Sequence, residues 1–565
     1  MNRAIILFFL LESVFTVAPS AGQHSSATSI TATVDPTKTW NTWDGWGSSL
    51  AWWARAIGGT RNAGIYADLI YTTSDISVAE EKYPGLGFNI ARYNVGGGGI
   101  NEPLERKSTH MPWFRDIHGY WTNPDSPVTD YASDWNWATD ANQRSMLLMA
   151  RDRGANLFEM FSDSPMWWMN ENHSTSGSDG GGDCLNPAYS KRFAIYLSTV
   201  ARYARDHWNI HFRSVEAFNE PSQGWWKFPG RQEGCHFDLG TQRTSLAELR
   251  NALDTAGLRD VLAVASDENS VDDALSTWNN LDDRTRLQIG RINVHGYFAG
   301  TEPYRGAKRE LLSAAAAGAS KPLWMSEYGD GDASGLSLAQ SILLDVRGLH
   351  PKAWIYWQPV EPEGSGWGLI NADYVDTDDQ ANGEIATPFV RVNRKFFVMG
   401  QFTRCIRQGF KIIDINDADS IAAYDDQTHR LVIVTLNSGI EKRVKYDLSR
   451  FSRIGSTFTR IATTIAPGHG VPDWKLRSDG PWTINESKKK RFWSRFYPNT
   501  VQTFLIDGVY QQHMLHARER SSVQLFRNCN VPSERTKSTV PHVASATLCQ
   551  QESNGAGYKQ TAGCR

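Results

Sequence analysis

The sequence predicts an α/β fold, a (β/α)8 barrel with an attached β-sandwich. Short apolar runs alternate with helical segments over residues 43–402, and strands without long helices follow over residues 403–509. In addition, two glutamates stand at the ends of two of the apolar runs. Strands that alternate with helices are typical of parallel βα units, and a chain of 565 residues is long enough for a second domain.

Eight short apolar runs are the candidate barrel strands. They are Gly45–Ser49, Phe88–Asn94, Ala155–Phe161, Ser214–Asn219, Val261–Ser266, Arg291–Val294, Leu323–Ser326 and Ala353–Trp357. Helical segments separate them, so we expect a parallel sheet that closes on itself. Asn186 and Pro187 fit the cap and first position of one of these helices, and Ser245 with Glu248 resembles a capping box for another.

The second domain is predicted from a change of period after residue 402. Turn residues separate the strands Lys411–Ile415, Ser420–Tyr424, Leu431–Leu436, Arg443–Leu448, Thr459–Thr464 and Thr500–Ile506. Such spacing favours a β-sandwich. The early strand Ser29–Val34 could join it, so we assign residues 29–36 and 403–509 to this domain.

Composition excludes several classes of partner. A net charge of −3 leaves no excess of basic residues to bind nucleic acid. The sequence also lacks a run of 18 apolar residues, so it does not suggest a membrane partner. We expect a monomer. The 22 Trp, 19 Tyr and 24 Phe fit either a large aromatic core or rings that stack on sugars.

The two ends of the chain differ from the middle. Arg3, the apolar run Ala4–Leu11 and small residues before position 22 predict a signal peptide over residues 1–21, and therefore an extracellular, secreted protein. Residues 510–565 are rich in Ser, Thr, Arg and Gln and fit a disordered tail or a wrongly assigned gene end.

The cysteines and sequons agree with secretion. Cys184 and Cys235 lie in loops after two predicted strands and could pair, although the sequence cannot decide it. No cysteine spacing resembles a zinc site, so we expect neither metal nor cofactor. Asn172 and Asn485 begin N-glycosylation sequons.

Glu220 and Glu327 are the candidate catalytic pair. Glu220 ends the fourth predicted strand within Ala217–Pro221, and Glu327 ends the seventh within Trp324–Gly329. A barrel carries its active site at the carboxyl ends of its strands, and cleavage of a glycosidic bond uses two carboxyl groups. The amide of Asn219, next to Glu220, can bond a sugar hydroxyl.

Five segments together carry a resemblance to a known family. They are Trp43–Trp53, Ala91–Gly97, Ser162–Met169, Ala217–Pro221 and Trp324–Gly329. Over about residues 29–509 the chain resembles glycoside hydrolase family 30 of clan A, most of all its secreted fungal endo-β-1,6-galactanases. The resemblance implies a retaining β-glycosidase that acts on β-1,6-galactan side chains of arabinogalactan.

The resemblance also implies a role for each site residue. Glu220 becomes the acid/base and Glu327 the nucleophile, which Arg92 would keep ionised unless it only forms a structural ion pair. Further candidates for substrate binding are Asn94, His295, Tyr297, Trp357, Trp168 and Trp226. For the loop tryptophans the alternative is that some of them only pin the loops.

Two other functions remain open at this stage. The same glutamates would serve a β-1,6-glucanase, a xylanase or a β-glucuronidase, since the subsites decide the sugar. A catalytically silent carbohydrate-binding protein on the same fold is the second alternative, which the intact glutamate pair disfavours.

Overall fold

The computed structural model describes residues 28–511, except for residues 79, 124–134, 298–306, 363, 377–388, 469 and 485. The predicted signal peptide, the predicted tail from residue 512 on and the sequon at Asn485 lie outside the described residues. No helix in the described part of the chain has the length and apolar character needed to cross a membrane.

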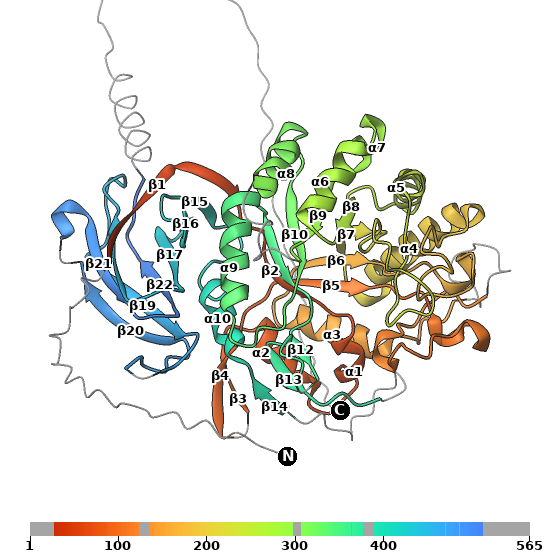
Figure 1. The fold of residues 1–565 in the computed structure, drawn as a ribbon, viewed down its shortest axis with the longest axis horizontal. Coiled ribbons are helices and arrows are strands. Elements are labelled where there is room, and N and C mark those ends of the chain that lie inside the picture. The colour runs from red at the N-terminus through yellow and green to blue at the C-terminus, as the bar shows by residue number, and fades with distance from the viewer. Residues whose placement is uncertain are drawn as a thin grey trace, which may run out of the picture. The chain divides into compact units, whose positions relative to one another are not determined.

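Eight parallel strands close into a barrel, which confirms the predicted fold class (Figure 1). In chain order they are β2 (Gly45–Ser49), β5 (Ile90–Asn94), β6 (Leu157–Phe161), β7 (Phe212–Glu216), β8 (Leu262–Glu268), β9 (Arg291–His295), β10 (Leu323–Tyr328) and β11 (Ala353–Tyr356). Each predicted strand overlaps one of them. The fourth differs most, because β7 begins two residues earlier than predicted and ends at Glu216, four residues before Glu220.

Helices cover the outside of the barrel (Figure 1). They are α1 (Trp53–Ile57), α2 (Ala63–Tyr71), α3 (Ala141–Asp152), α4 (Ser190–Tyr203), α5 (Leu239–Thr255), α6 (Val271–Asn280), α7 (Asp283–Gln288), α8 (Ala307–Gly318), α9 (Leu336–Leu344) and α10 (Arg394–Thr403). Short π-helical turns, η6 (Ala204–Trp208) and η7 (Asp345–Leu349), extend α4 and α9. Single 3₁₀ turns are η1 (Gly99–Asn101), η2 (Leu104–Arg106), η3 (Trp113–Arg115), η4 (Trp167–Met169), η5 (Pro187–Tyr189) and η8 (Ser487–Lys489).

One of the two predicted helix starts is confirmed. Asn186 accepts a bond from the backbone N–H of Ala188 at 2.9 Å, and Pro187 opens the turn that leads into α4. The capping box at Ser245 is wrong, since α5 begins at Leu239. The first turns of α5 are mostly polar, so the apolar pattern used to predict helices did not detect them.

Small sheets and one large sheet complete the fold. The small ones are β3 (Asp75–Val78) with β4 (Glu81–Pro84), and β12 (Val360–Glu361), β13 (Ile370–Ala372) and β14 (Phe389–Val392). The nine-stranded sheet has the order β20-β19-β22-β17-β16-β15-β1-β18-β21. Its strands are β1 (Thr28–Thr42), β15 (Lys411–Ile415), β16 (Ser420–Asp425), β17 (Arg430–Asn437), β18 (Lys442–Asp447), β19 (Thr457–Thr464), β20 (Arg477–Thr483), β21 (Arg491–Phe496) and β22 (Thr500–Ile506).

Strand β1 joins the two layers of this sheet-rich region, the β-sandwich. Its first part, Thr28–Thr33, pairs in parallel with β18. The rest pairs antiparallel with β15 from Val34 on, with an irregularity between Asp35 and Thr39. A buried apolar cluster that includes Val34, Ile413, Tyr446 and Phe504 fills the space between the layers. The sequence did not predict the two outermost strands, β20 and β21.

Hydrogen bonds tie the sandwich to the barrel, and both belong to one compact unit. Thr503 of β22 donates to the carbonyl of Gln401 in α10 at 3.0 Å. Arg347, in the turn after α9, donates to the carbonyls of Ile415 (2.9 Å) and Ser420 (2.8 Å) in the sandwich. The barrel and the sandwich therefore share polar contacts as well as a packed surface.

Replacing Arg347 by Ala should lower the free energy of unfolding by roughly 2–3 kcal/mol, because two partly buried carbonyls lose a charged donor. Urea unfolding followed by circular dichroism measures the change. The exposed Arg284 is the matched control, and Arg284→Ala should shift stability by less than about 0.5 kcal/mol. Equal effects of the two substitutions would contradict a linking role for Arg347.

Candidate active site

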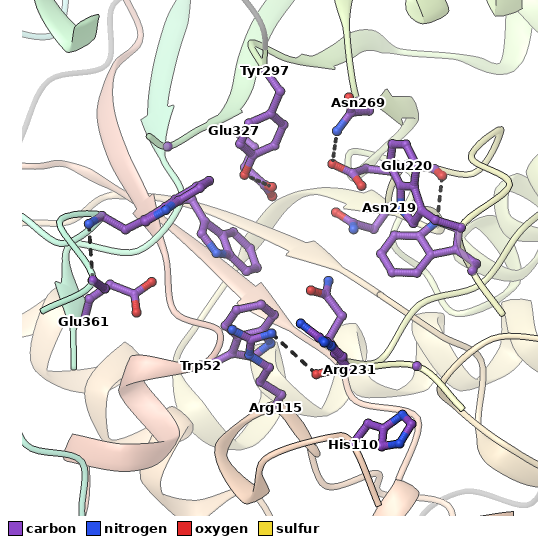
Figure 2. Close-up of a pocket in the computed structure, with 18 of the residues that line it drawn as sticks. Trp52, His110, Arg115, Asn219, Glu220, Arg231, Asn269, Tyr297, Glu327 and Glu361 are labelled. Atoms are coloured by element: carbon purple, nitrogen blue, oxygen red, sulfur yellow. Dashed lines mark hydrogen bonds between the residues drawn. The ribbon is translucent and has the colours of Figure 1, made fainter. Parts of the chain in front are cut away.

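A cavity of about 1000 Å³ opens where the carboxyl ends of the barrel strands meet their loops (Figure 2). Residues that follow seven of the eight strands, all but β6, line it. Tryptophans and carboxylates dominate the lining, namely Trp52, Trp225, Trp226, Trp357 and Trp367 with Glu220, Glu327, Asp330 and Glu361. Apolar walls with a few convergent polar groups are typical of a ligand site.

Glu220 reaches the cavity from the turn after β7. Its φ of 50° is unusual for a residue other than glycine, and its backbone N–H donates to the carbonyl of Asp267 at 2.9 Å. Asn269, after β8, donates from Nδ2 to Glu220 Oε1 at 2.7 Å, and the indole N–H of Trp226 donates to the Glu220 carbonyl at 2.8 Å (Figure 2). The turn and its side chain are thus held by the end of β8 and by the loop to which Glu220 itself belongs.

Glu327 lies near the end of β10 and is nearly buried. Arg92 donates from Nη1 to Glu327 Oε2 at 2.9 Å, and Tyr297 donates from its hydroxyl to Oε1 at 2.8 Å (Figure 2). Burial raises the pKa of Glu327, while the positive charges of His295 and Arg92 oppose this rise. Both oxygens of Glu327 therefore accept bonds from fixed donors.

The two glutamates and His295 form one cluster. An oxygen of Glu220, an oxygen of Glu327 and a ring nitrogen of His295 all lie within 4.8 Å of one another. The Nδ1 atom of His295 is 3.2 Å from Glu220 Oε1 and 3.4 Å from Glu327 Oε1. The carboxyl groups are thus closer than the roughly 6.5–9.5 Å that an inverting glycosidase leaves for a water.

Arg92 is buried beneath this cluster and binds three carboxylates. Besides Glu327 it contacts Asp267, and its Nε donates to Glu159 Oε1 at 3.1 Å. Ser49 accepts a further bond from Nη1 at 3.0 Å. These partners come from different strands, so one guanidinium connects β2, β6, β8 and β10.

His295 carries a second positive charge at the same place. Burial lowers its pKa, but Glu327 and Asp267 outweigh that effect and raise it to about 10. Asp267, 3.3 Å from His295 Nε2, is buried, yet the charges of Arg92 and His295 lower its pKa. The imidazole is therefore protonated over the neutral pH range.

A metal ion fits this cluster poorly. Glu220, His295 and Glu327 present ligand atoms at suitable separations, but a protonated imidazole has no lone pair for a metal. Arg92 already supplies the charge that Glu327 needs. A second group, formed by Asp183, His236 and Asp238, is satisfied internally, because Asp183 accepts from the backbone of Asp238 and from Thr241.

Most of the predicted site residues meet here. Glu220, Glu327, Asn219, Tyr297, Trp226 and Trp357 line the cavity. Arg92 and His295 lie directly beneath and contact the glutamates. Asn219 presents a buried side-chain oxygen that has no bonding partner among the residues that the structure describes.

Two predicted binding residues lie elsewhere. Asn94 is buried and donates from Nδ2 to Asp163 Oδ2 at 2.8 Å, and it does not line the cavity. Trp168 packs edge-on against Trp121, with ring centroids 5.2 Å apart, and its indole N–H donates to the Trp121 carbonyl. Trp168 therefore helps to fix the loop that it belongs to.

Several lining residues were missed by the sequence analysis. Trp52 packs edge-on against Trp357 at 5.0 Å, and the guanidinium of Arg115 lies 4.1 Å from the Trp52 ring. Asn269 directly follows the fifth barrel strand, a position that could have identified it. Nothing local distinguishes Trp367, which comes from a loop after β12.

Two features that agreed with secretion, the possible Cys184–Cys235 pair and the sequon at Asn172, make contacts within the protein. Cys184 and Cys235 are both buried as free thiols, and Cys184 Sγ accepts a bond from the backbone N–H of His236 at 3.2 Å. The predicted pairing is therefore absent. Asn172 is only 7% exposed, and its Nδ2 donates to the Gly177 carbonyl and to Asp179 Oδ1; an attached glycan would displace one of these two bonds.

Comparisons with known proteins agree on one family. Residues 29–291 match the family described as O-Glycosyl hydrolase family 30. An endo-beta-1,6-galactanase from Hypocrea rufa is 42% identical over 518 residues, which are 90% of this chain and 100% of that protein.

Solved structures share the fold. A conserved exported protein from Bacteroides fragilis superposes with a TM-score of 0.69 at 18% identity, covering 84% of this chain and 100% of that chain. The catalytic domain of the GH30 xylanase C from Talaromyces cellulolyticus superposes with a TM-score of 0.59, also at 18% identity, and covers 84% of this chain and 99% of that one.

The charge on His295 should make stability depend on pH. Its pKa is higher in the folded state than the value of about 6.5 expected after unfolding, so its contribution is complete below about pH 6.5 and disappears towards pH 10. Over that range the wild type should lose on the order of 4 kcal/mol more stability than His295→Gln. Urea unfolding at a series of pH values measures both proteins.

The control for this experiment is the exposed His211, whose replacement by Gln should leave the wild-type pH profile unchanged. Parallel profiles for the wild type and His295→Gln would show that the imidazole is neutral in the folded protein.

Proposed function

The chain belongs to O-glycosyl hydrolase family 30 and is a glycoside hydrolase, and we propose that it is a secreted, retaining endo-β-1,6-galactanase. The observation that carries this proposal is the 42% identity to a named endo-beta-1,6-galactanase along that protein's whole length. The proposed substrate is the β-1,6-galactan side chain of arabinogalactan. Secretion rests on the signal-like residues 1–21.

In the first step Glu327 attacks the anomeric carbon. Arg92 and Tyr297 bond its two oxygens and so fix the direction of attack. Glu220 at the same time protonates the leaving oxygen. Since Glu220 Oε1 accepts a bond from Asn269, Oε2 is the oxygen that carries this proton.

In the second step Glu220 acts as a base and activates a water. Once Glu327 is esterified, its negative charge is gone, and Nδ1 of His295 lies 3.2 Å from Glu220 Oε1. The water then attacks the galactosyl-enzyme from the face that the leaving group has vacated. Two inversions give retention, and the 4.8 Å limit on the cluster supports this course.

Aromatic rings around the cluster supply the surface for a sugar chain. Trp225 and Trp367 are 51% and 37% exposed on the cavity wall, whereas Trp52 and Trp357 are nearly buried at its floor. A pyranose presents apolar C–H groups on one face, which pack well on an indole ring. The buried pair would hold the sugar that reacts, and the exposed pair its neighbours in the chain.

Replacing each glutamate by Gln tests the two roles separately. Glu327→Gln should lower kcat by at least about 10⁴-fold on every substrate, because no covalent intermediate forms. Glu220→Gln should lower kcat by about 10²–10⁴-fold on galacto-oligosaccharides. The ratio kcat/KM, which reports the first step, should fall far less on an aryl galactobioside than on galacto-oligosaccharides, because the aryl leaving group needs no proton; kcat stays low on both because the second step lacks its base. Equal losses of kcat/KM on the two substrates would remove Glu220 from the acid role.

The sugar specificity needs its own assay. De-arabinosylated arabinogalactan should be cleaved to short β-1,6-galacto-oligosaccharides that keep the β configuration when NMR records the first product. Pustulan, a β-1,6-glucan, and glucuronoxylan serve as controls and should be cleaved at least about 100-fold more slowly, since a changed hydroxyl leaves polar groups of the site unpaired. Cleavage of pustulan alone would reject the galactanase and favour a β-1,6-glucanase.

A further inference from the structure

The exposed tryptophans occur as two pairs in different domains. Of the 22 tryptophans, all within the described residues, only Trp225, Trp367, Trp482 and Trp493 are more than about a third exposed. The first two line the catalytic cavity. Trp482 and Trp493, which are 48% and 43% exposed, line a separate hollow of about 440 Å³ in the β-sandwich.

This sandwich hollow lies between the two ends of the nine-stranded sheet. Strands β20 and β21 are the outermost strands, and both contribute to the hollow together with β19, so the sheet curls until its ends face each other (Figure 1). Phe458 and Phe492 meet between them, with ring centroids 4.4 Å apart, and both are nearly buried. The hollow therefore has an aromatic floor as well as two exposed rings.

Ion pairs fix the polar groups around the rings. Arg460 binds Asp479 at 3.0 and 2.5 Å, and Asp479 also accepts the indole N–H of Trp482 at 2.8 Å. On the opposite strand Arg495 lies in the hollow and binds Glu441 at 2.7 and 2.6 Å. Each guanidinium is thus held in place with its charge balanced by a carboxylate.

These groups suit an uncharged polyhydroxyl ligand. A sugar hydroxyl both donates and accepts, and a guanidinium–carboxylate pair offers donors and acceptors side by side. Because the charges are balanced, a strongly charged ligand gains little. The exposed rings match the apolar face of a pyranose, as in the catalytic cavity.

An extended peptide fits the sandwich hollow less well. A peptide that adds to a sheet edge needs an unbroken row of backbone N–H and carbonyl groups. Pro481 has no N–H within β20, and the pairing of β19 with β20 is irregular between Phe458 and Arg460. The edge therefore disfavours the addition of a strand.

We propose that the sandwich hollow is a second carbohydrate-binding site, one that takes an uncharged hexopyranose chain. It contains no carboxylate pair like that of Glu220 and Glu327, so it binds without cleaving. Its role is to keep the enzyme on a polysaccharide while the barrel acts, which raises the local concentration of bonds to cleave. Binding in the sandwich hollow does not depend on which hexopyranose chain the barrel hydrolyses.

The test compares the wild type with the double variant Trp482→Ala/Trp493→Ala. On a polysaccharide the double variant should show a KM higher by roughly fivefold to tenfold at unchanged kcat, while both constants for a short oligosaccharide stay the same. Affinity electrophoresis in the inactive Glu327→Gln background should show a matching loss of retardation in gels that contain the same polysaccharide.

Three controls complete the design. Trp482→Phe/Trp493→Phe keeps the aromatic rings and should retain most of the binding. Ile440→Ala removes another exposed apolar side chain of the sandwich and should change nothing. Thermal unfolding verifies that each variant is folded, and the Phe variant and the single variant Trp493→Ala carry the comparison if the double Ala variant is not.

The outcomes separate this site from the proposed activity. Tryptophan-dependent retardation by pustulan rather than by galactan would support the site and weaken the galactanase assignment. The proposal would be overturned if de-arabinosylated arabinogalactan, pustulan and glucuronoxylan each retarded the protein to the same extent with and without the two tryptophans. So would an equal rise of KM on the short oligosaccharide, since the variant would then affect the catalytic cavity.

Discussion

The buried guanidinium of Arg92 holds the active site together. It binds Glu159, Asp267 and Glu327 with no exposure to solvent, and it lies 3.9 Å from the face of the Phe161 ring. Burying a charge is costly unless it is paired and bonded on every side, and here carboxylates and Ser49 meet that demand. Loss of the guanidinium would remove a positive charge that three buried carboxylates share in the barrel interior, and would leave Arg291 and His295 to balance them.

The same network sets the charge on the catalytic groups. Arg92 and His295 provide positive charge where Glu327 and Asp267 provide negative charge, whereas burial raises the pKa of Asp163 nearby to about 8. The two cations lower the pKa of Asp267, whereas burial leaves the pKa of Glu327 and of Asp163 raised. Protein environment, rather than residue type, thus sets the protonation of each carboxyl.

The catalytic cavity and the sandwich hollow both have aromatic surfaces but differ in their charged groups. In the catalytic cavity carboxyl groups converge within 4.8 Å and can react with a bound sugar. Beside the sandwich hollow the carboxylates of Asp479 and Glu441 are each bound to a guanidinium. Stacking surfaces can bind a sugar in either place, but only the barrel provides the paired carboxyls that catalysis requires.

From the sequence alone we could predict that the barrel has eight strands, single out Glu220 and Glu327 as a candidate pair and recognise the family. Apolar periodicity and short motifs are local properties, so they can be read without the structure. Only the tertiary structure decided that β7 stops at Glu216, that Glu220 lies in a turn with φ of 50°, and that Trp168 packs inside its loop. It also revealed Asn269 and the exposed strand β20, whose Ser, Asp, Gly and Pro residues give no strand-like pattern. These features depend on contacts between residues far apart in the chain, and such contacts leave no period in the sequence.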